Sequence, residues 1–119
     1  MIKIYKGYLK GNGKHAASSF KNGEKLLSYH TVRKHDSFVG ILDDEYIMVD
    51  IDDMDEAEIL LDIVEDKDIQ CSVLETDNGM HFYFKGYDLT ANKIKWYSNI
   101  GILADYKLGI KNTADPLRI

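Results

Sequence analysis

The sequence predicts an α+β chain of 119 residues in which one antiparallel sheet, over residues 46–110, follows a small basic α/β extension over residues 1–45. Two patterns favour this class. Short apolar or alternating runs bounded by turn residues are typical of strands, whereas one longer stretch has its apolar residues at helical spacing. A hydrophobic content of 45% in a chain of this length supports a single domain with a substantial core.

The extension is expected to contain little regular structure. Residues 2–5 read as a short strand that leads into a basic loop over residues 6–14, which holds three glycines. Glycines allow backbone amides to approach a ligand, but this spacing matches no phosphate-binding motif. A short helix is expected within residues 20–35, ending near Val32, and residues 38–42 read as a strand.

The main sheet is expected to begin with a strand over residues 46–51, and the clearest helix of the chain follows it. Asp53 and Glu56 make a start that resembles a capping box, and acidic residues in the first turn suit the helix dipole. An apolar stripe then recurs at positions i, i+3, i+4 and i+7. The stripe consists of Ala57, Leu60, Leu61 and Val64.

Two strands, a second helix and a last strand complete the predicted sheet. Residues 71–75 and 80–84 form a hairpin around the turn Asp77-Asn78-Gly79. A weaker helical pattern covers residues 90–98, and residues 101–107 read as the last strand. No element is expected after it.

From Tyr46 the predicted order is β-α-β-β-α-β, the split βαβ unit of ferredoxin-like and RNA-recognition-motif-like folds. In that topology the first strand lies between the third and the fourth, which run antiparallel to it, and both helices cover one face. The end of the first strand, with Asp50 and Asp52, then meets His81 on one side and Asp105 on the other. Four polar residues are therefore predicted to converge on the open face of the sheet.

This convergence predicts a metal site. Side chains alternate along a strand, so Asp50 and Asp52 point to the same side, roughly 6.6 Å apart, and repel each other by about 2.5 kcal/mol at a moderate effective dielectric. A hard divalent cation turns the repulsion into attraction, and three carboxylates, with Asp105, suit two-metal chemistry on a nucleoside triphosphate. His81 and amides at the hairpin turn are placed to hydrogen-bond a phosphate. The alternatives are a solvated strand end for the two acids and a packing role for the histidine.

The sequence gives less support to other kinds of catalytic or metal site. Cys71 is the single cysteine and is read as packing, which suits a reducing cytoplasm. The histidines lack zinc-ligand spacing, no serine stands in a Gly-x-Ser-x-Gly turn, and the aromatic residues 82–84 are read as core and sheet surface. No apolar run approaches ~20 residues and no signal-peptide pattern opens the chain, so we expect a soluble, cytoplasmic protein without a membrane partner.

Charge is strongly segregated along the chain, although its net value is only −5. Residues 1–35 carry eight Lys and Arg against one acid, whereas residues 43–77 carry fifteen acids against one base. The basic segment suggests an anionic partner such as nucleic acid, beside an acidic metal-binding region. Its candidate DNA-binding residues are Lys10 and Lys14. The alternative is that both segments are merely solvated.

Three sequence runs in order, IMVDIDD, ETDNGMHFYF and GILADYKLG, carry a resemblance to a known family. They resemble the motif series of the archaeo-eukaryotic primase superfamily: a hydrophobic strand ending in Asp-x-Asp, a small-residue turn reaching a His, and a hydrophobic strand ending in Asp. The chain is similar in particular to the N-terminal primase-polymerase modules of phages and mobile elements. The upstream runs DSFVGIL and YKGYLKGNGK also resemble segments of those modules.

The resemblance implies the catalytic core of a DNA primase-polymerase, an enzyme that adds nucleotides from NTP or dNTP to a primer in phage or plasmid replication within a bacterial cell. It implies that Asp50, Asp52 and Asp105 are catalytic and bind Mg²⁺ or Mn²⁺, and that His81 and Lys107 contact the incoming triphosphate. A DNA template is the further implied partner. Family members usually continue past the third motif, often into a helicase module, so a longer protein is implied. The alternative is a non-catalytic nucleic-acid-binding or inhibitory module of the same fold.

Overall fold

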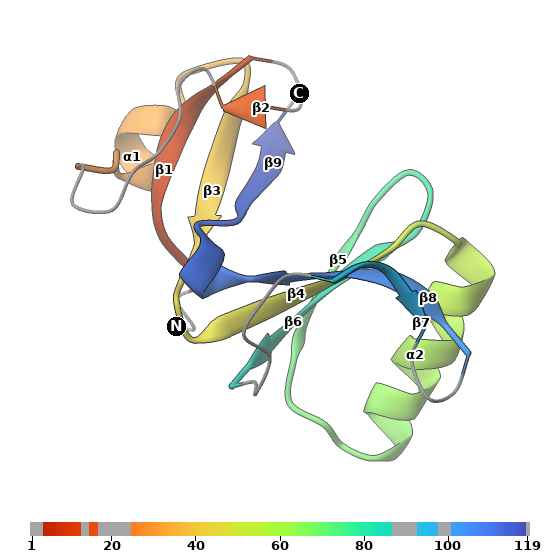
Figure 1. The fold of residues 1–119 in the computed structure, drawn as a ribbon. Helices are drawn as coiled ribbons and strands as arrows, with labels where there is room; N and C mark the ends of the chain where they lie inside the picture. The colour runs from red at the N-terminus through yellow and green to blue at the C-terminus, as the bar shows by residue number, and fades with distance from the viewer. Residues whose placement is uncertain (1–3, 13–14, 17–24, 87–92, 98–100, 119) are drawn as a thin grey trace. The chain divides into compact units, whose positions relative to one another are not determined.

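The computed structural model describes residues 4–12, 15–16, 25–86, 93–97 and 101–118. They form an α+β fold with two antiparallel sheets and few helices in the described part of the chain (Figure 1), which confirms the predicted class. The chain divides into two compact units, one made of Met1–Asp44 with Gly109–Ile119 and the other of Glu45–Leu108. Within the described ranges no helix has the length and apolar character needed to cross a membrane.

The first unit is built on a sheet with the strand order β2-β1-β3-β9. Each strand pairs antiparallel with its neighbour, and a short helix begins at Ser28, whose side chain accepts a hydrogen bond from the Thr31 amide. The elements of this unit are β1 (Tyr5–Asn12), β2 (His15–Ala16), α1 (Tyr29–Val32), β3 (Phe38–Leu42), the 3₁₀ turn η1 (Gly109–Lys111) and β9 (Ala114–Arg118).

The strand predicted at residues 38–42 is confirmed as β3, but the loop predicted over residues 6–14 is wrong, because β1 runs through Asn12. The glycines suggested a loop, yet in β1 they allow neighbouring segments to pack closely against the strand. A Cβ on Gly7 would lie 2.3 Å from Leu26 Cβ, and one on Gly11 would lie 2.3 Å from Ser37 Oγ. Residues 13 and 14, and residues 2 and 3 of the strand predicted at residues 2–5, lie outside the described residues.

Two further expectations for the first unit need correction. The helix expected within residues 20–35 is described only as the four residues of α1, and residues 20–24 lie outside the described part. The sequence predicts no element after residue 107, whereas β9 pairs with β3. Pro116 stands opposite Val39 on this edge strand, where the absence of an amide proton costs no ladder hydrogen bond.

The second unit is a five-stranded antiparallel sheet with one helix in its described part, and its strand order is β5-β6-β4-β8-β7. The predicted neighbours of the first strand are present, since β4 lies between β6 and β8. The elements of this unit are β4 (Tyr46–Ile51), α2 (Met54–Asp66), β5 (Ser72–Glu75), β6 (Met80–Lys85), β7 (Lys93–Tyr97) and β8 (Leu103–Leu108).

The helix predicted over residues 90–98 is wrong. Residues 93–97 form β7, which pairs antiparallel with β8 at the edge of the sheet. The segment reads Lys-Ile-Lys-Trp-Tyr, and its β-branched and aromatic residues fit a pleated surface better than a helix. Residues 90–92 and 98 lie outside the described part.

Helix α2 covers one face of the second sheet and leaves the candidate site on the other (Figure 1). The predicted cap is confirmed, because the Asp53 carboxylate accepts a hydrogen bond from the Glu56 amide at 3.0 Å. Cys71 is partly buried against the same core, and this burial raises the pKa of its thiol. The buried core cluster consists of Val49, Ile51, Ala57, Met80, Phe82, Ile102 and Ala104.

Candidate metal and nucleotide site

Three of the predicted site residues lie in one row across the second sheet. The register of β4 places Asp50 opposite His81 of β6 on one side and opposite Asp105 of β8 on the other. Residues directly opposed on antiparallel strands project from the same face, with their Cβ atoms about 4.5–5.5 Å apart. The structure therefore brings together side chains that are far apart in the sequence, on the face that α2 leaves uncovered.

Asp52 joins this row from the end of β4. It is exposed and lies one residue before Asp53, which caps α2. The pKa of Asp52 is raised, first by the negative charge of Asp50, then by burial and by the charge of Asp105. Because both other carboxylates act on Asp52, the three acids share one electrostatic environment.

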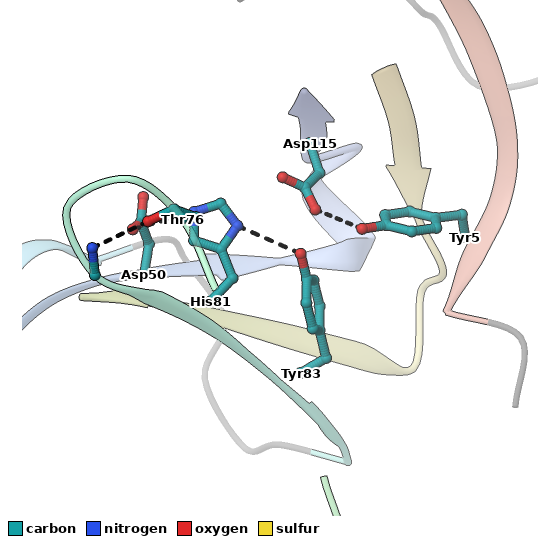
Figure 2. Close-up of polar contacts among 7 residues, drawn as sticks. Tyr5, Asp50, Thr76, His81, Tyr83 and Asp115 are labelled. Carbon is teal, nitrogen blue, oxygen red and sulfur yellow. Dashed lines mark hydrogen bonds and ion pairs between the residues drawn. The ribbon is translucent and has the colours of Figure 1, made fainter. Parts of the chain in front are cut away.

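Asp50 and His81 form the central contact of the site (Figure 2). Asp50 Oδ1 lies 3.2 Å from His81 Nε2, and the two side chains are 14% and 13% exposed. Burial by itself would raise the pKa of Asp50, but the contact with His81 and the positive charges of His81 and Lys107 lower it below its usual value. Asp50 is therefore an ionised carboxylate at neutral pH, although it is largely buried.

Tyr83 supports His81 from the next position on the same strand face (Figure 2). Its hydroxyl lies 3.3 Å from His81 Nδ1, and the two rings meet nearly edge to face with centroids 6.3 Å apart. Because Nε2 faces the Asp50 carboxylate, we assign a proton to Nε2; the Tyr83 hydroxyl then donates to Nδ1 of the neutral ring, or accepts from Nδ1 when the ring is charged. Sequence reasoning assigned Tyr83 only a packing role. Strand alternation, which puts residues i and i+2 on one face, was the signal that could have found it.

The turn between β5 and β6 is packed against the end of β4. A Cβ on Gly79 would lie 1.8 Å from the carbonyl oxygen of Ile51 and 3.2 Å from the Cα of Asp52, so only glycine fits there. Within the turn the Thr76 amide donates to the Gly79 carbonyl at 2.9 Å, and the Gly79 amide donates to the Thr76 hydroxyl at 3.1 Å (Figure 2). These two amides are thus engaged inside the turn, which they hold in shape beside Asp52.

The predicted lysines lie in different units. Lys107 stands two residues beyond Asp105 on β8, so it projects from the same face as the carboxylates, and its charge helps to lower the pKa of Asp50. Lys10 is exposed on β1 of the first unit, opposite Phe38. Lys14 lies outside the described residues.

The donor set fits a hard divalent cation. Asp50 Oδ1 is buried, and no described donor meets it with hydrogen-bond geometry, even though His81 lies within ion-pair distance. Among the described residues, no three Asp, Glu, His or Cys side chains already converge as a metal cage. Mg²⁺ usually takes one or two carboxylates together with waters and substrate phosphates. The described carboxylates would therefore supply only part of the ligand shell of such an ion, and waters or other oxygen ligands would supply the rest.

Comparisons with known proteins add no further assignment: no family model, curated protein or solved structure matches the chain. The chemistry of the site therefore rests on its own residues. Those residues present a buried, ionised carboxylate beside a histidine, with two further acids and a lysine on the same sheet face.

Proposed function

We propose that the second unit binds nucleoside triphosphates together with Mg²⁺ or Mn²⁺ and transfers nucleotides to a primer, as the catalytic core of a DNA primase-polymerase. The observation that carries the proposal is the row His81, Asp50 and Asp105 across β6, β4 and β8, with Asp52 at the end of β4. In this row a histidine, a group able to bind phosphate, stands directly beside carboxylates, which are able to bind a cation. Such a pairing is what a metal-bound triphosphate requires.

The proposal gives each carboxylate a role. Asp50, Asp52 and Asp105 hold the divalent ion, which when bound neutralises the charge that develops in phosphoryl transfer. Asp50 is the anchoring ligand, because it is ionised and partly buried in a fixed place on β4. The mutual repulsion that raises the pKa of Asp52 favours cation binding at the same time.

The proposal also assigns the basic residues. His81 Nε2 faces Asp50 in the structure. Once Asp50 serves as a metal ligand, the Nε2 proton is available to a phosphate oxygen, and Tyr83 keeps the ring oriented through Nδ1. Lys107 adds a positive charge on the same face, where it attracts the triphosphate.

We propose more specifically that this unit has a ferredoxin-like, RNA-recognition-motif-like fold, in which β7 adds a fifth strand at the edge of the sheet. The order β5-β6-β4-β8 and the placing of α2 on the face opposite the site support this proposal. The second helix of that topology has no support, since residues 93–97 are a strand.

Calorimetry with Mn²⁺ and a nucleoside triphosphate tests the binding step. We expect the wild-type chain to bind the nucleotide only when the metal is present, and Asp50→Asn and Asp105→Asn to abolish that binding. Asp62→Asn is the matched control, because it removes the same charge from an exposed position on α2. Nucleotide binding that needs no metal, or that survives Asp50→Asn, contradicts the proposal.

Primer extension with labelled dNTP on a DNA template tests the transfer step. Extension that requires both the metal and Asp50 supports the catalytic assignment. Metal-dependent nucleotide binding without any extension favours the non-catalytic module instead.

A further inference from the structure

Leu74 continues the row of site residues by one more strand. β5 pairs antiparallel with β6, and its register places Leu74 directly opposite His81. The row therefore runs Leu74, His81, Asp50, Asp105 across four neighbouring strands, and all four side chains project from one face. With strands about 4.8 Å apart, Leu74 is one strand spacing from His81 and two from Asp50.

Leu74 is an apolar side chain left open to solvent at this end of the row. It is 40% exposed, and β5 is the edge strand on this side of the sheet as the structure describes it. The turn that follows β5 is fixed, because Gly79 packs on the backbone of Ile51 and Asp52. The hairpin thus holds Leu74 at a set place relative to the carboxylates.

The surroundings of His81 restrict where the rest of a bound nucleotide can lie. The next row along the strands on this face runs Ser72, Tyr83, Met48, Lys107. Its two central side chains, Tyr83 and Met48, are only 3% and 2% exposed, so the centre of that row presents almost no surface to a ligand. Past His81, away from the carboxylates, the row ends at the accessible apolar surface of Leu74. A ligand that is charged at one end and has a flat apolar face at the other matches the order of side chains along this row, from the carboxylates through His81 to Leu74.

We propose that Leu74 packs against the nucleoside part of the nucleotide whose phosphates lie at His81, Asp50 and Asp105. The inference rests on the proposed function and deepens it, because it orients the nucleotide with its base and sugar toward the β5 edge. Leu74 then contributes affinity for nucleosides without contacting the metal or the phosphates.

Val73 provides a matched control. It is adjacent to Leu74 on the same edge strand, is apolar and is 39% exposed, but it stands opposite Phe82 and so projects from the other face. The pair Leu74→Ala and Val73→Ala therefore separates a ligand contact from a general effect on β5. Leu74→Met keeps an apolar side chain of similar volume and serves as the conservative variant.

Binding of dATP and of inorganic triphosphate, each measured by calorimetry with Mn²⁺, tests the inference. We expect Leu74→Ala to weaken dATP binding about three- to tenfold, because it removes apolar contact area. We expect it to leave inorganic triphosphate binding unchanged. Val73→Ala should change neither ligand, and Leu74→Met should bind dATP like the wild-type chain.

The outcomes separate this inference from the proposed function. If the wild-type chain binds dATP but Leu74→Ala binds it equally well, the role of Leu74 is wrong and the proposed function stands. The same holds if Val73→Ala weakens dATP binding as much, or if Leu74→Ala also weakens inorganic triphosphate binding. If the wild-type chain binds neither ligand with Mn²⁺, the proposed function fails, and the role of Leu74 fails with it.

Discussion

Asp50 and Asp52 carry the same chemical group two residues apart, yet their surroundings move their pKa values in opposite directions. Burial would raise the pKa of Asp50, but His81 and Lys107 lower it. Asp52 lacks such a dominant partner, so the negative charge of Asp50 raises its pKa. The residue types were readable from the sequence, whereas this asymmetry depends on the register of β4 and β6, which places His81 opposite Asp50.

The first prediction concerns the coupling of these two acids. Asp50→Asn should lower the pKa of Asp52, because it removes the largest cause of the increase. A raised pKa means that Asp52 takes up its proton at a higher pH than an ordinary aspartate does. As the pH falls, protons should therefore begin to compete with the metal for Asp52 at a higher pH than they would at an ordinary aspartate. Carboxyl ¹³C NMR titration of both chains measures the shift. An unchanged Asp52 titration would contradict the coupling.

The second prediction separates His81 from the proposed metal ligands. His81→Ala should weaken triphosphate binding about ten- to hundredfold, the value of a hydrogen bond to a charged group. It should leave Mn²⁺ binding nearly unchanged, because the ring is not needed as a ligand. Tyr83→Phe should have a smaller effect in the same direction, since it removes only the contact to Nδ1. Calorimetry with each ligand checks both variants, and wild-type triphosphate affinity in His81→Ala would assign His81 to packing.

At the level of elements, local signals predicted β4, α2 and the β5–β6 hairpin, because the sequence of each element contains a cap, a turn or a spacing pattern typical of it. Asp53 and Glu56 mark the helix start, and Asn78 with Gly79 marks the turn. The failures arose where packing overrides local pattern. The glycines of β1 permit close approach of other segments rather than a loop, and residues 93–97 become a strand by pairing with β8. The row of site residues was predictable because it follows from strand order and alternation alone.

The third prediction concerns Gly79. Gly79→Ala should lower the free energy of unfolding by about 2 kcal/mol or more, because its Cβ would overlap the carbonyl oxygen of Ile51 and force backbone to move. Asn78→Ala changes the same turn at an exposed position and should cost less. Urea unfolding of the two variants gives the comparison. Equal stability of Gly79→Ala and the wild-type chain would show that the turn is free to shift away from β4.

At the level of the whole molecule, both ends of the sequence build the first unit, and the second is one continuous segment between them. β9 acquires its structure through β3, and the buried carboxylate of Asp115 on β9 accepts a hydrogen bond from the Tyr5 hydroxyl on β1 (Figure 2). A strand that is defined by partners this distant in the sequence leaves almost no local signal. That is why the sequence did not predict β9, although it predicted most elements of the second unit.

The last prediction follows from the charge of the two units. The eight bases of residues 1–35 belong to the first unit, and the site carboxylates belong to the second, so template phosphates should contact the first unit. Lys10→Glu, at an exposed position on β1, should weaken binding of single-stranded DNA at low salt and leave Mn²⁺-dependent triphosphate binding unchanged. Removing one ion pair between the protein and a phosphate should flatten the log-log salt dependence by about 0.7. Lys67→Glu makes the same charge change at an exposed position after α2 and should leave the slope as it is. If both variants weaken DNA binding equally, net charge rather than the β1 surface governs DNA binding, and the assignment of Lys10 is wrong.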